Sequence, residues 1–395
     1  MVYRMTEWIE CTLDKLGEIV GGATPSTKCE DYYGGSIPWI TPKDLSSFKG
    51  RYITSGERNI TEKGLASCSA QMMPKDAVLF TSRAPIGYVA IASQSVCTNQ
   101  GFKSIVVNEK ADPLFVYYLL KYNKDAIEAM GSGTTFKEVS GKTMRAVKVR
   151  IPLDVSYQKR IAAVLDSLDT KIENNERIND NLYAQAKAIF DNHFINIDAI
   201  PAGWRKGNLL DIANYLNGLA MQKFRPQGHE IGLPVLKIKE LRQGSCDDSS
   251  ELCSLSIKPE YIIHNGDVVF SWSGSLLVDI WCGGTCGLNQ HLFKVTSDVY
   301  DKWFYYLWTA HHLARFIAIA ADKATTMGHI KREELAKAEV LIPCEEDYTS
   351  FNSIMQPIFE LMISNRIESR KLAALRDELL PKLMSGEIDV SDVQI

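Results

Sequence analysis

Two long stretches of the chain carry apolar residues at alternating four- and three-residue steps, which is the spacing of a coiled-coil seam. The spacing predicts two long helices, 158–194 and about 346–384. Pro357 and Pro381 should bend the second helix or mark its ends. The predicted seams consist of Ile161, Leu165, Leu168, Ile172, Leu182, Ala186 and Ile189 in the first helix and of Ile354, Ile358, Leu361, Leu372, Leu375 and Leu379 in the second.

Polar residues interrupt each seam near its middle, at Asn175 and Asn179 in the first helix and at Asn365 and Glu368 in the second. Antiparallel pairing would place the two midpoints opposite each other. We therefore expect Asn175 and Asn365 to come within hydrogen-bonding reach, directly or through one water. A buried Asn pair costs stability but fixes register, so leucine at both positions should raise thermal stability and loosen the register. The alternative is that each helix packs only on its own domain.

The two segments that precede these helices are similar in sequence. Short β-branched or aromatic runs predict strands, and one helix is predicted in each segment, near 113–130 and 300–320. Strand and helix do not alternate regularly, which argues against a doubly wound parallel sheet. Six blocks match in order: 37–45 with 233–241, 73–91 with 263–281, 97–107 with 287–297, 115–123 with 303–311, 133–140 with 324–331, and 147–152 with 338–343.

These patterns predict an α+β chain in which two mixed α/β domains form a tandem repeat. The globular domains would occupy residues 1–152 and 201–343, and each would be followed by a helical spacer segment, 153–200 or 344–395. Because the repeat is head-to-tail and the helices are expected to form an antiparallel coiled coil, the arrangement should be pseudo-two-fold symmetric. At about 1.5 Å per residue the first helix would span roughly 55 Å.

The charged residues are unevenly distributed between the predicted domains and the spacer segments. The formal net charge is −4, which argues against simple nucleic-acid binding. However, residues 1–150 hold 19 Lys and Arg against 15 Asp and Glu, and residues 201–343 hold 15 of each. The acidity lies in 151–200 and 344–395. Phosphate contact needs only local positive charge. With no apolar run of membrane-spanning length and no secretory signal, we expect a cytoplasmic protein.

The nine cysteines are irregularly spaced and include no CxxC pair. Cys246, Cys253, Cys282 and Cys286 come closest to a zinc site, but structural zinc usually requires two tight pairs and only the second of these pairs is tight. We expect buried, reduced thiols and no bound metal.

No catalytic motif is present. The sequence has no Pro-Pro dipeptide, which the Asn/Asp-Pro-Pro-aromatic motif of adenine methyltransferases requires. Ser140-Gly141-Lys142-Thr143 imitates the end of a P-loop, but Phe136 stands where the first glycine is needed. The acidic-x-Lys motif of metal nucleases occurs only as Asp169-Thr170-Lys171, within a predicted helix. We therefore expect a non-catalytic protein.

The order globular domain, long helix, globular domain, long helix resembles the specificity subunit of type I restriction-modification enzymes. Blocks 21–45, 81–91, 98–102 and 133–144 resemble that family's first-domain motifs. Blocks 266–284, 288–295 and 323–335 resemble those of its second domain, and 379–390 resembles its C-terminal signature. The resemblance covers nearly the whole chain.

The resemblance implies a sequence-specific DNA-binding subunit whose two target recognition domains read the halves of a split, asymmetric site in double-stranded DNA. It also implies that methyltransferase (modification) subunits, two of them, dock on the spacer helices, and that nuclease-translocase (restriction) subunits join the complex. The cofactors S-adenosylmethionine, ATP and Mg would belong to those partners and not to this chain. The alternative is a non-enzymatic coiled-coil scaffold protein without sequence-specific DNA readout. Polar loops favour the DNA-binding interpretation.

Candidate DNA contacts are polar and basic loop residues, since Arg suits guanine, Asn and Gln suit adenine, and Lys suits phosphate. Asn99-Gln100 and Asn289-Gln290 recur at equivalent places. Two domains that read different bases need not share residues, which favours a structural or phosphate-directed role for these pairs. Trp39, Trp272, Tyr32 and Tyr33 are expected in packing. The candidates are Thr24, Ser26, Thr27, Lys28, Lys43, Ser82, Arg83, Asn99, Gln100, Thr134, Thr135 and Lys137 in the first domain and Lys223, Arg225, Lys237, Lys239, Arg242, Ser271, Ser273, Asn289, Gln290, Thr325, Thr326 and His329 in the second.

Overall fold

A computed structural model describes residues 7–133, 137–322 and 330–394. Over these residues helices and strands are mixed without regular alternation, as the α+β expectation requires. No helix in this part of the chain is long and apolar enough to cross a membrane. Five candidate residues lie outside the described residues: Thr134, Thr135, Thr325, Thr326 and His329.

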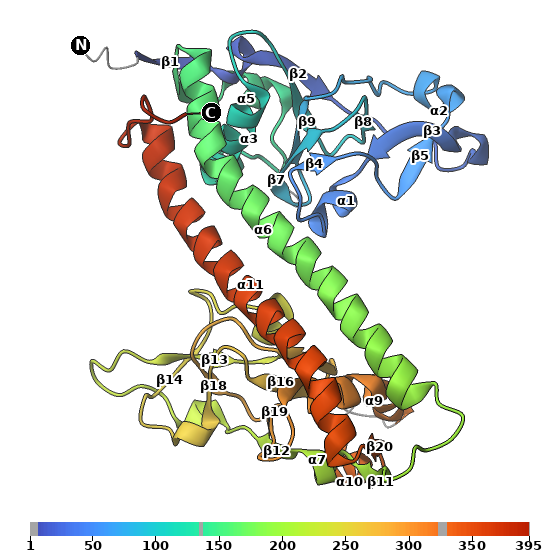
Figure 1. Ribbon diagram of the computed structural model, residues 1–395. Helices are drawn as coiled ribbons and strands as arrows, with labels where there is room; N and C mark the ends of the chain where they lie inside the picture. The colour runs from blue at the N-terminus through green and yellow to red at the C-terminus, as the bar shows by residue number, and fades with distance from the viewer. Residues whose placement is uncertain (1–6, 134–136, 323–329, 395) are drawn as a thin grey trace. The chain divides into compact units, whose positions relative to one another are not determined.

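The chain divides into two compact units. Unit 1 takes residues 1–173 and 372–395, and unit 2 takes residues 174–371. The two long helices are α6 (Val155–Phe190) and α11 (Glu345–Ser385), drawn in green and red in Figure 1. Each helix contributes one part to each unit, so the two predicted spacer segments are each divided between the units.

Unit 1 contains one strand pair and two larger sheets. In the pair, β1 lies antiparallel to β10. The larger sheets have the strand orders β2-β9-β6-β7-β4 and β5-β3-β8. The strands are β1 (Trp8–Thr12), β2 (Gly17–Gly21), β3 (Tyr33–Ile40), β4 (Tyr52–Ile53), β5 (Arg58–Ile60), β6 (Val78–Ser82), β7 (Ile86–Ala92), β8 (Cys97–Thr98), β9 (Lys103–Val107) and β10 (Lys148–Pro152).

Unit 2 repeats this plan. The pair is β11-β20, and the larger sheets have the orders β12-β19-β16-β17 and β14-β13-β18-β15. The strands are β11 (Arg205–Asn208), β12 (Asn214–Asn217), β13 (Leu233–Leu236), β14 (Leu252–Cys253), β15 (Ile262–Ile263), β16 (Val268–Ser271), β17 (Leu277–Ile280), β18 (Cys286–Leu288), β19 (Leu292–Thr296) and β20 (Glu339–Ile342).

The repeat predicted from sequence is confirmed by strand pairing. In unit 1, β3 and β8 are parallel, and in unit 2 the equivalent strands β13 and β18 are parallel as well. Gly22 and Gly218 occupy the same position after the first strand of each large sheet. A Cβ atom at either residue would lie 2.1 or 2.2 Å from the carbonyl oxygen of Asn99 or Asn289, so both repeats need glycine there.

The helix predicted near 113–130 is two helices, α3 (Pro113–Tyr122) and α4 (Lys124–Ala129). They break at Asn123, whose side chain donates to the carbonyl of Leu119 over 2.8 Å. The equivalent α9 (Lys302–Asp322) is continuous. Shorter helices are α1 (Pro42–Ser46), α2 (Glu62–Ala66), α5 (Gly141–Ala146), α7 (Leu209–Ile212), α8 (Ile238–Gln243) and α10 (Arg332–Ala336), and a π-helical turn (Asp191–Ile195) follows α6.

Each unit has its own main core, and both long helices enter it. In unit 1, strand, α3 and α6 residues such as Phe80, Phe115 and Ile161 pack together with Leu383 and Val390 from the C-terminal stretch. In unit 2 the core is rich in aromatic rings. Its large buried members are Phe190, Phe194, Tyr215, Phe270, Trp303, Phe304, Trp308, Phe316 and Phe359.

The predicted seam of α6 is confirmed, because all seven of its residues are buried or half-buried. The predicted seam of α11 is wrong at Ile354, Leu361 and Leu375, which are 50%, 47% and 43% exposed. Met355 and Phe359 are buried instead. The reason is that α11 packs on its own domain as well as on α6, so its buried face is wider than, and rotated from, the seam.

Pro357 and Pro381 do not mark the ends of α11, which runs from Glu345 to Ser385 through both. The prediction that these prolines mark the ends of the helix is wrong. Both prolines are exposed, as are Ser353 and Asp377 four residues before them. Solvent can therefore satisfy the carbonyl groups that lose their helical partner.

Candidate nucleic-acid interface

In unit 1 the candidate loops gather at one edge because β3 and β8 are parallel and end together. Ile40 pairs with Thr98, and the amide of Asn99 donates to the carbonyl of Ile40 over 3.0 Å. The loops that begin at Thr41 and Asn99 therefore leave the sheet side by side. Asp44 fixes the first of them by accepting from the amide of Thr41 over 2.7 Å, which caps α1.

The second loop is a tight turn that presents Gln100. The Oδ1 atom of Asn99 accepts from the amide of Gly101 over 2.8 Å, and the carbonyl of Asn99 accepts from the amide of Phe102 over 3.4 Å. Thr24, from the loop after β2, donates its hydroxyl to Oε1 of Gln100. Gln100 is exposed.

The end of β6 joins the same edge. The amide of Ser82 donates to the carbonyl of Gly101 over 2.7 Å, and the carbonyl of Ser82 accepts from Val139 over 2.9 Å. Arg83 pairs with Glu138 over 3.3 Å, and Lys103 approaches the same carboxylate at 3.6 Å. Lys137 is exposed nearby in sequence.

Unit 2 builds an equivalent turn. The Oδ1 atom of Asn289 accepts from the amide of His291 over 3.2 Å, and its carbonyl accepts from Leu292 over 3.0 Å. The Nε2 atom of Gln290 lies 3.3 Å from Nε2 of the neighbouring His291 ring. The amide of Trp272 donates to the carbonyl of His291 over 3.4 Å, as Ser82 does to Gly101 in unit 1.

The structure does not support DNA contacts by three predicted serines. Ser82 and Ser271 are fully buried, and Ser273 is 5% exposed. The hydroxyl of Ser271 donates to the carbonyls of Ser273 and Ser275, which ties the β16–β17 turn together. We therefore remove these serines from the set of candidate contacts. Their position at a strand end concealed that their side chains face inward.

Several basic candidates already have acidic partners. Lys43 pairs with Glu57 over 2.6 Å. The carboxylate of Glu251 accepts hydrogen bonds from both Lys237 and Arg225. These hydrogen bonds lower the pKa of its carboxyl group, and the bond from Lys237 has the larger effect. Phosphate would have to compete with these carboxylates. Lys239 similarly lies 3.7 Å from Asp247. The exposed basic candidates also include Lys28, Lys137, Lys223 and Arg242.

The aromatic candidates pack as expected in unit 1. Trp39 is buried and its indole donates to the carbonyl of Ala23 over 3.0 Å, and the hydroxyl of Tyr33 donates to Pro25 over 2.7 Å. In unit 2, Trp272 is half-buried. Its indole donates to Oδ1 of Asn217 over 3.0 Å, and its ring lies 6.4 Å from that of His291.

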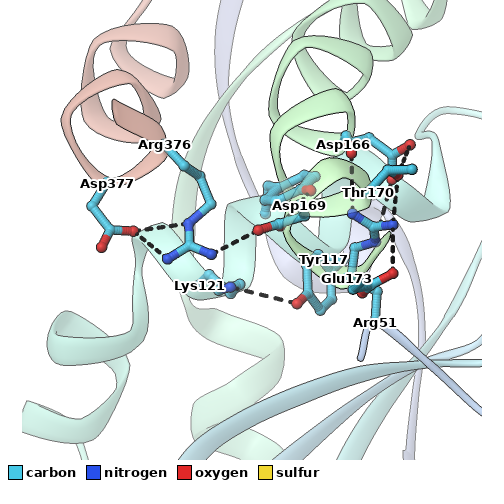
Figure 2. A network of polar contacts seen from close by, with 10 residues as sticks. Arg51, Tyr117, Lys121, Asp166, Asp169, Thr170, Glu173, Arg376 and Asp377 are labelled. Atoms are coloured by element: carbon cyan, nitrogen blue, oxygen red, sulfur yellow. Dashed lines mark hydrogen bonds and ion pairs between the residues drawn. The ribbon is translucent and has the colours of Figure 1, made fainter. Parts of the chain in front are cut away.

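Arg51 attaches the unit 1 domain to α6. Figure 2 shows its guanidinium group among Asp166, Thr170 and Glu173 of the helix. It donates to the carbonyl of Asp166 over 3.1 Å, to the hydroxyl of Thr170 over 2.8 Å and to Glu173 over 3.1 Å. Burial raises the pKa of Glu173, and the charge of Arg51 opposes that rise.

Asp169 joins α6 to α11 in the same unit. Its buried carboxylate accepts from the hydroxyl of Tyr118 over 2.8 Å. It also accepts from Arg376 of α11 over 2.6 Å (Figure 2). Burial alone would lower the pKa of Arg376, but the hydrogen bond with Asp169 raises it overall. Asp377, which is largely exposed, contacts the same guanidinium group over 2.7 Å.

In unit 2 the helices run antiparallel. Asn175 approaches the carbonyl of Asn365 at 3.5 Å and donates to Glu368 over 2.7 Å, whereas Asn179, one turn later, donates to Met362 over 3.0 Å. The predicted approach of Asn175 to Asn365 is therefore present. That this contact sets the register remains a proposal.

Arg366 of α11 holds the unit 2 domain through both oxygens of Asp279, at 2.9 and 2.7 Å. Nothing in the sequence pattern marks Arg51, Arg366 or Arg376 as functional residues. A heptad pattern considers apolar positions only, and no motif marks an arginine that reaches a neighbouring element.

The motif-like segments have structural roles. Ser140 caps α5, since its hydroxyl accepts from the amide of Thr143 over 3.0 Å. Asp169 is engaged by Tyr118 and Arg376. Over residues 7–133, 137–322 and 330–394, no three His, Cys, Asp or Glu side chains are grouped to hold a metal ion. Burial raises the pKa of Cys253, Cys282 and Cys286 above the ordinary thiol value, and Cys246 is half-buried.

Known proteins share both the sequence and the fold. Residues 5–184 match the family model described as the type I restriction modification DNA specificity domain. The chain is 34% identical over 414 residues to the type I restriction enzyme MjaIX specificity subunit of Methanocaldococcus jannaschii, covering 98% of this chain and 95% of that protein. It is 29% identical over 167 residues to the EcoR124I/EcoR124II specificity subunit of Escherichia coli, covering 40% of each.

A solved structure has the same architecture. The type I restriction-modification S subunit from M. genitalium superposes with a TM-score of 0.60 over 97% of both chains, at 14% identity. At this identity the likeness concerns the fold.

Proposed function

The chain belongs to the family of type I restriction enzyme specificity subunits, and we propose that its two units each read one half of a split, asymmetric DNA site. The family provides sequence recognition without catalysis, and the methylating and cutting activities belong to separate subunits. A coiled-coil scaffold without DNA readout is not favoured.

One observation supports two independent readers most strongly. The strand orders β2-β9-β6-β7 and β5-β3-β8 of unit 1 recur in unit 2 as β12-β19-β16-β17 and β14-β13-β18, and equivalent main-chain hydrogen bonds form a loop edge in each unit. The side chains on that frame differ. Ser82 and Gly101 in unit 1 correspond to Trp272 and His291 in unit 2. A shared frame with different side chains is what two readers of different sequences require.

The test is a domain exchange. Residues 1–152 are replaced by the matching domain of a relative with a different target, and methylated adenines are mapped after assembly with the methyltransferase subunits. One half of the recognised sequence should change and the other should stay. A change in both halves would show that the units do not read independently.

We also propose that two methyltransferase subunits bind the long helices and that the purified chain alone neither methylates nor cuts DNA. Ile354 and Leu361 support a partner on α11, since they lie seven residues apart on one helix face and about half of each side chain is exposed. Leu361→Asp should weaken co-elution with the methyltransferase subunits in gel filtration, whereas Glu360→Asp, at an adjacent exposed position, should not. Unchanged co-elution of both would place the partner elsewhere.

A further inference from the structure

Gln100 and Gln290 occupy the same place in the two units. Each is the second residue of a four-residue turn in which the preceding Asn accepts two main-chain amides, one through Oδ1 and one through its carbonyl. Because Asn99 and Asn289 use these atoms to build the turn, their recurrence is structural. At this place in the turn Gln100 is exposed and Gln290 is half-buried.

The two glutamine amides have different hydrogen-bond partners. In unit 1 the hydroxyl of Thr24 donates to Oε1 of Gln100. In unit 2 the Nε2 atom of Gln290 donates to Nε2 of His291 over 3.3 Å, since an amide nitrogen cannot accept. Within the described residues neither amide makes another hydrogen bond. Among the described residues, the two N–H groups of Gln100 are therefore left without partners in unit 1, whereas the oxygen and one N–H of Gln290 are left without partners in unit 2.

We propose that this glutamine contacts a base in both units and that its neighbour within each unit decides which base it selects. The proposal rests on the proposed function, in which these loop edges face DNA. In the major groove guanine offers two acceptors, N7 and O6, whereas adenine offers the acceptor N7 beside the donor N6. Gln100 then suits guanine, and Gln290 suits adenine.

If the neighbour of each glutamine decides the base, the two repeats must differ at these neighbouring positions, and they do. The position of Thr24 is Ala220 in unit 2, which has no hydroxyl to offer, and the position of His291 is Gly101 in unit 1, which has no ring. The His291 ring is supported by Trp272, whose indole is itself held by Asn217. Each unit therefore has one of the two orienting groups and lacks the other.

The experiment makes one isosteric change at both positions. Gln100→Glu and Gln290→Glu are each assembled with the methyltransferase subunits and given duplexes with randomised sites, and the methylated products are sequenced. Carboxylates only accept hydrogen bonds. Glu at 100 should cut the preference for guanine at one position of the unit 1 half-site by roughly tenfold. Glu at 290 should move one position of the unit 2 half-site from adenine toward cytosine, whose N4 group donates.

The orienting residues are tested separately. Thr24→Val frees the oxygen of Gln100, so adenine should become acceptable at the guanine position without loss of overall methylation. Thr27→Val, in the same loop, is the matched control and should leave the sequence unchanged. His291→Leu should relax the adenine position in the other half-site only. If Thr24 or His291 had only a structural role, its substitution would change the unfolding temperature and leave the preferred base unchanged.

Two results overturn the proposal: unchanged base preference in both glutamate variants with the wild-type unfolding temperature, or the same new base in both half-sites. If a glutamate variant unfolds, Thr24→Val and His291→Leu decide the matter, and unchanged preference in both again overturns it. A wild-type complex that methylates randomised duplexes without any sequence preference would instead refute the proposed function.

Discussion

Asn365 donates a hydrogen bond from Nδ2 to Oδ1 of Asn179 over 2.9 Å, one helical turn away from the residue with which it was expected to pair. The Nδ2 atom of Asn175 approaches the main-chain carbonyl of Asn365 and not its side chain. The same Nδ2 atom donates a hydrogen bond to the carboxylate of Glu368. The polar contact between the helices is therefore a short ladder. Leucine at both 175 and 365 would leave Oδ1 of Asn179 without its donor, so we now expect that pair of changes to lower stability.

This ladder predicts strong coupling between Asn365 and Asn179. Asn365→Leu should lower the free energy of unfolding by about 1–3 kcal/mol, because it leaves a partly buried acceptor unsatisfied. Adding Asn179→Leu removes that acceptor and should recover most of the loss. Urea unfolding of the four proteins in the double-mutant cycle measures the coupling. Additive losses would show that the two side chains act independently.

The two carboxylates that contact Arg376, those of Asp169 and Asp377, should contribute unequally to the free energy of unfolding. Asp169→Ala leaves Arg376 with only the exposed Asp377 and leaves the hydroxyl of buried Tyr118 without its acceptor, which should cost about 3 kcal/mol of unfolding free energy. Asp377→Ala removes an exposed partner of the same guanidinium group and should cost at most about 0.5 kcal/mol. Chemical denaturation of both variants gives the comparison. Equal losses would mean that burial does not decide the strength of this pair.

The contact between Arg366 and Asp279 depends on its two-pronged geometry. Lysine keeps the charge but can reach only one carboxylate oxygen well, so Arg366→Lys should lower the free energy of unfolding by about 1.5 kcal/mol. Arg177→Lys is the control, since Arg177 on α6 is exposed and donates one hydrogen bond, to Asn174 of the same helix. If the two variants unfold alike, the bidentate contact contributes nothing.

Asp389 should make the C-terminal segment sensitive to acid. Hydrogen bonds from Ser391 and then Tyr157 hold the pKa of Asp389 below its ordinary value of 3.8. A depressed folded-state pKa means that the unfolded segment binds the proton first. The stabilisation is present above pH 3.8 and is lost as the pH falls through the folded-state value.

The measurement is hydrogen exchange over residues 386–394, corrected for its intrinsic pH dependence. The amide of Val390, which donates to the Tyr157 hydroxyl over 3.2 Å, should lose protection in acid. Asp389→Asn should remove this pH dependence and weaken protection at neutral pH. Asp392→Asn should behave as wild type. An acid response that survives Asp389→Asn must come from another group.

The sequence predicted the repeat and the buried positions of α6, because both depend on periodic or duplicated apolar positions. It did not predict the parallel pairing of β3 with β8, which brings the candidate loops to one edge. Residues such as Ile161 and Leu165 are buried because they lie on the apolar face of the helix, and this follows from their spacing alone. The same rule failed on α11. Ile354 and Leu361 fit a heptad, but the side of the helix that is buried is set by Met355 and Phe359 against the unit 2 core.

The individual side chains at the candidate site were less predictable. Ser82 and Ser271 stand at strand ends, where polarity predicts exposure, yet β6 and β16 are buried at every position. Arg51 carries no periodic signal, since its three hydrogen bonds to α6 are with residues more than a hundred positions away. Such contacts follow from tertiary packing. The sequence does not mark His291, because the similarity between the repeats lies in the shared Asn and Gln, and His291 is at the next position, where the repeats differ.

The division of the chain also has a consequence for the order in which it folds. Unit 2 is one uninterrupted stretch, 174–371, whereas unit 1 needs residues 372–395 to close over its earlier part. Gly386 lies against Trp8, and Val390 enters the same core as Ile161. As the ribosome makes the chain from its amino end, all of unit 2 emerges before those closing residues exist. The unit that is started first must therefore be the last to be completed.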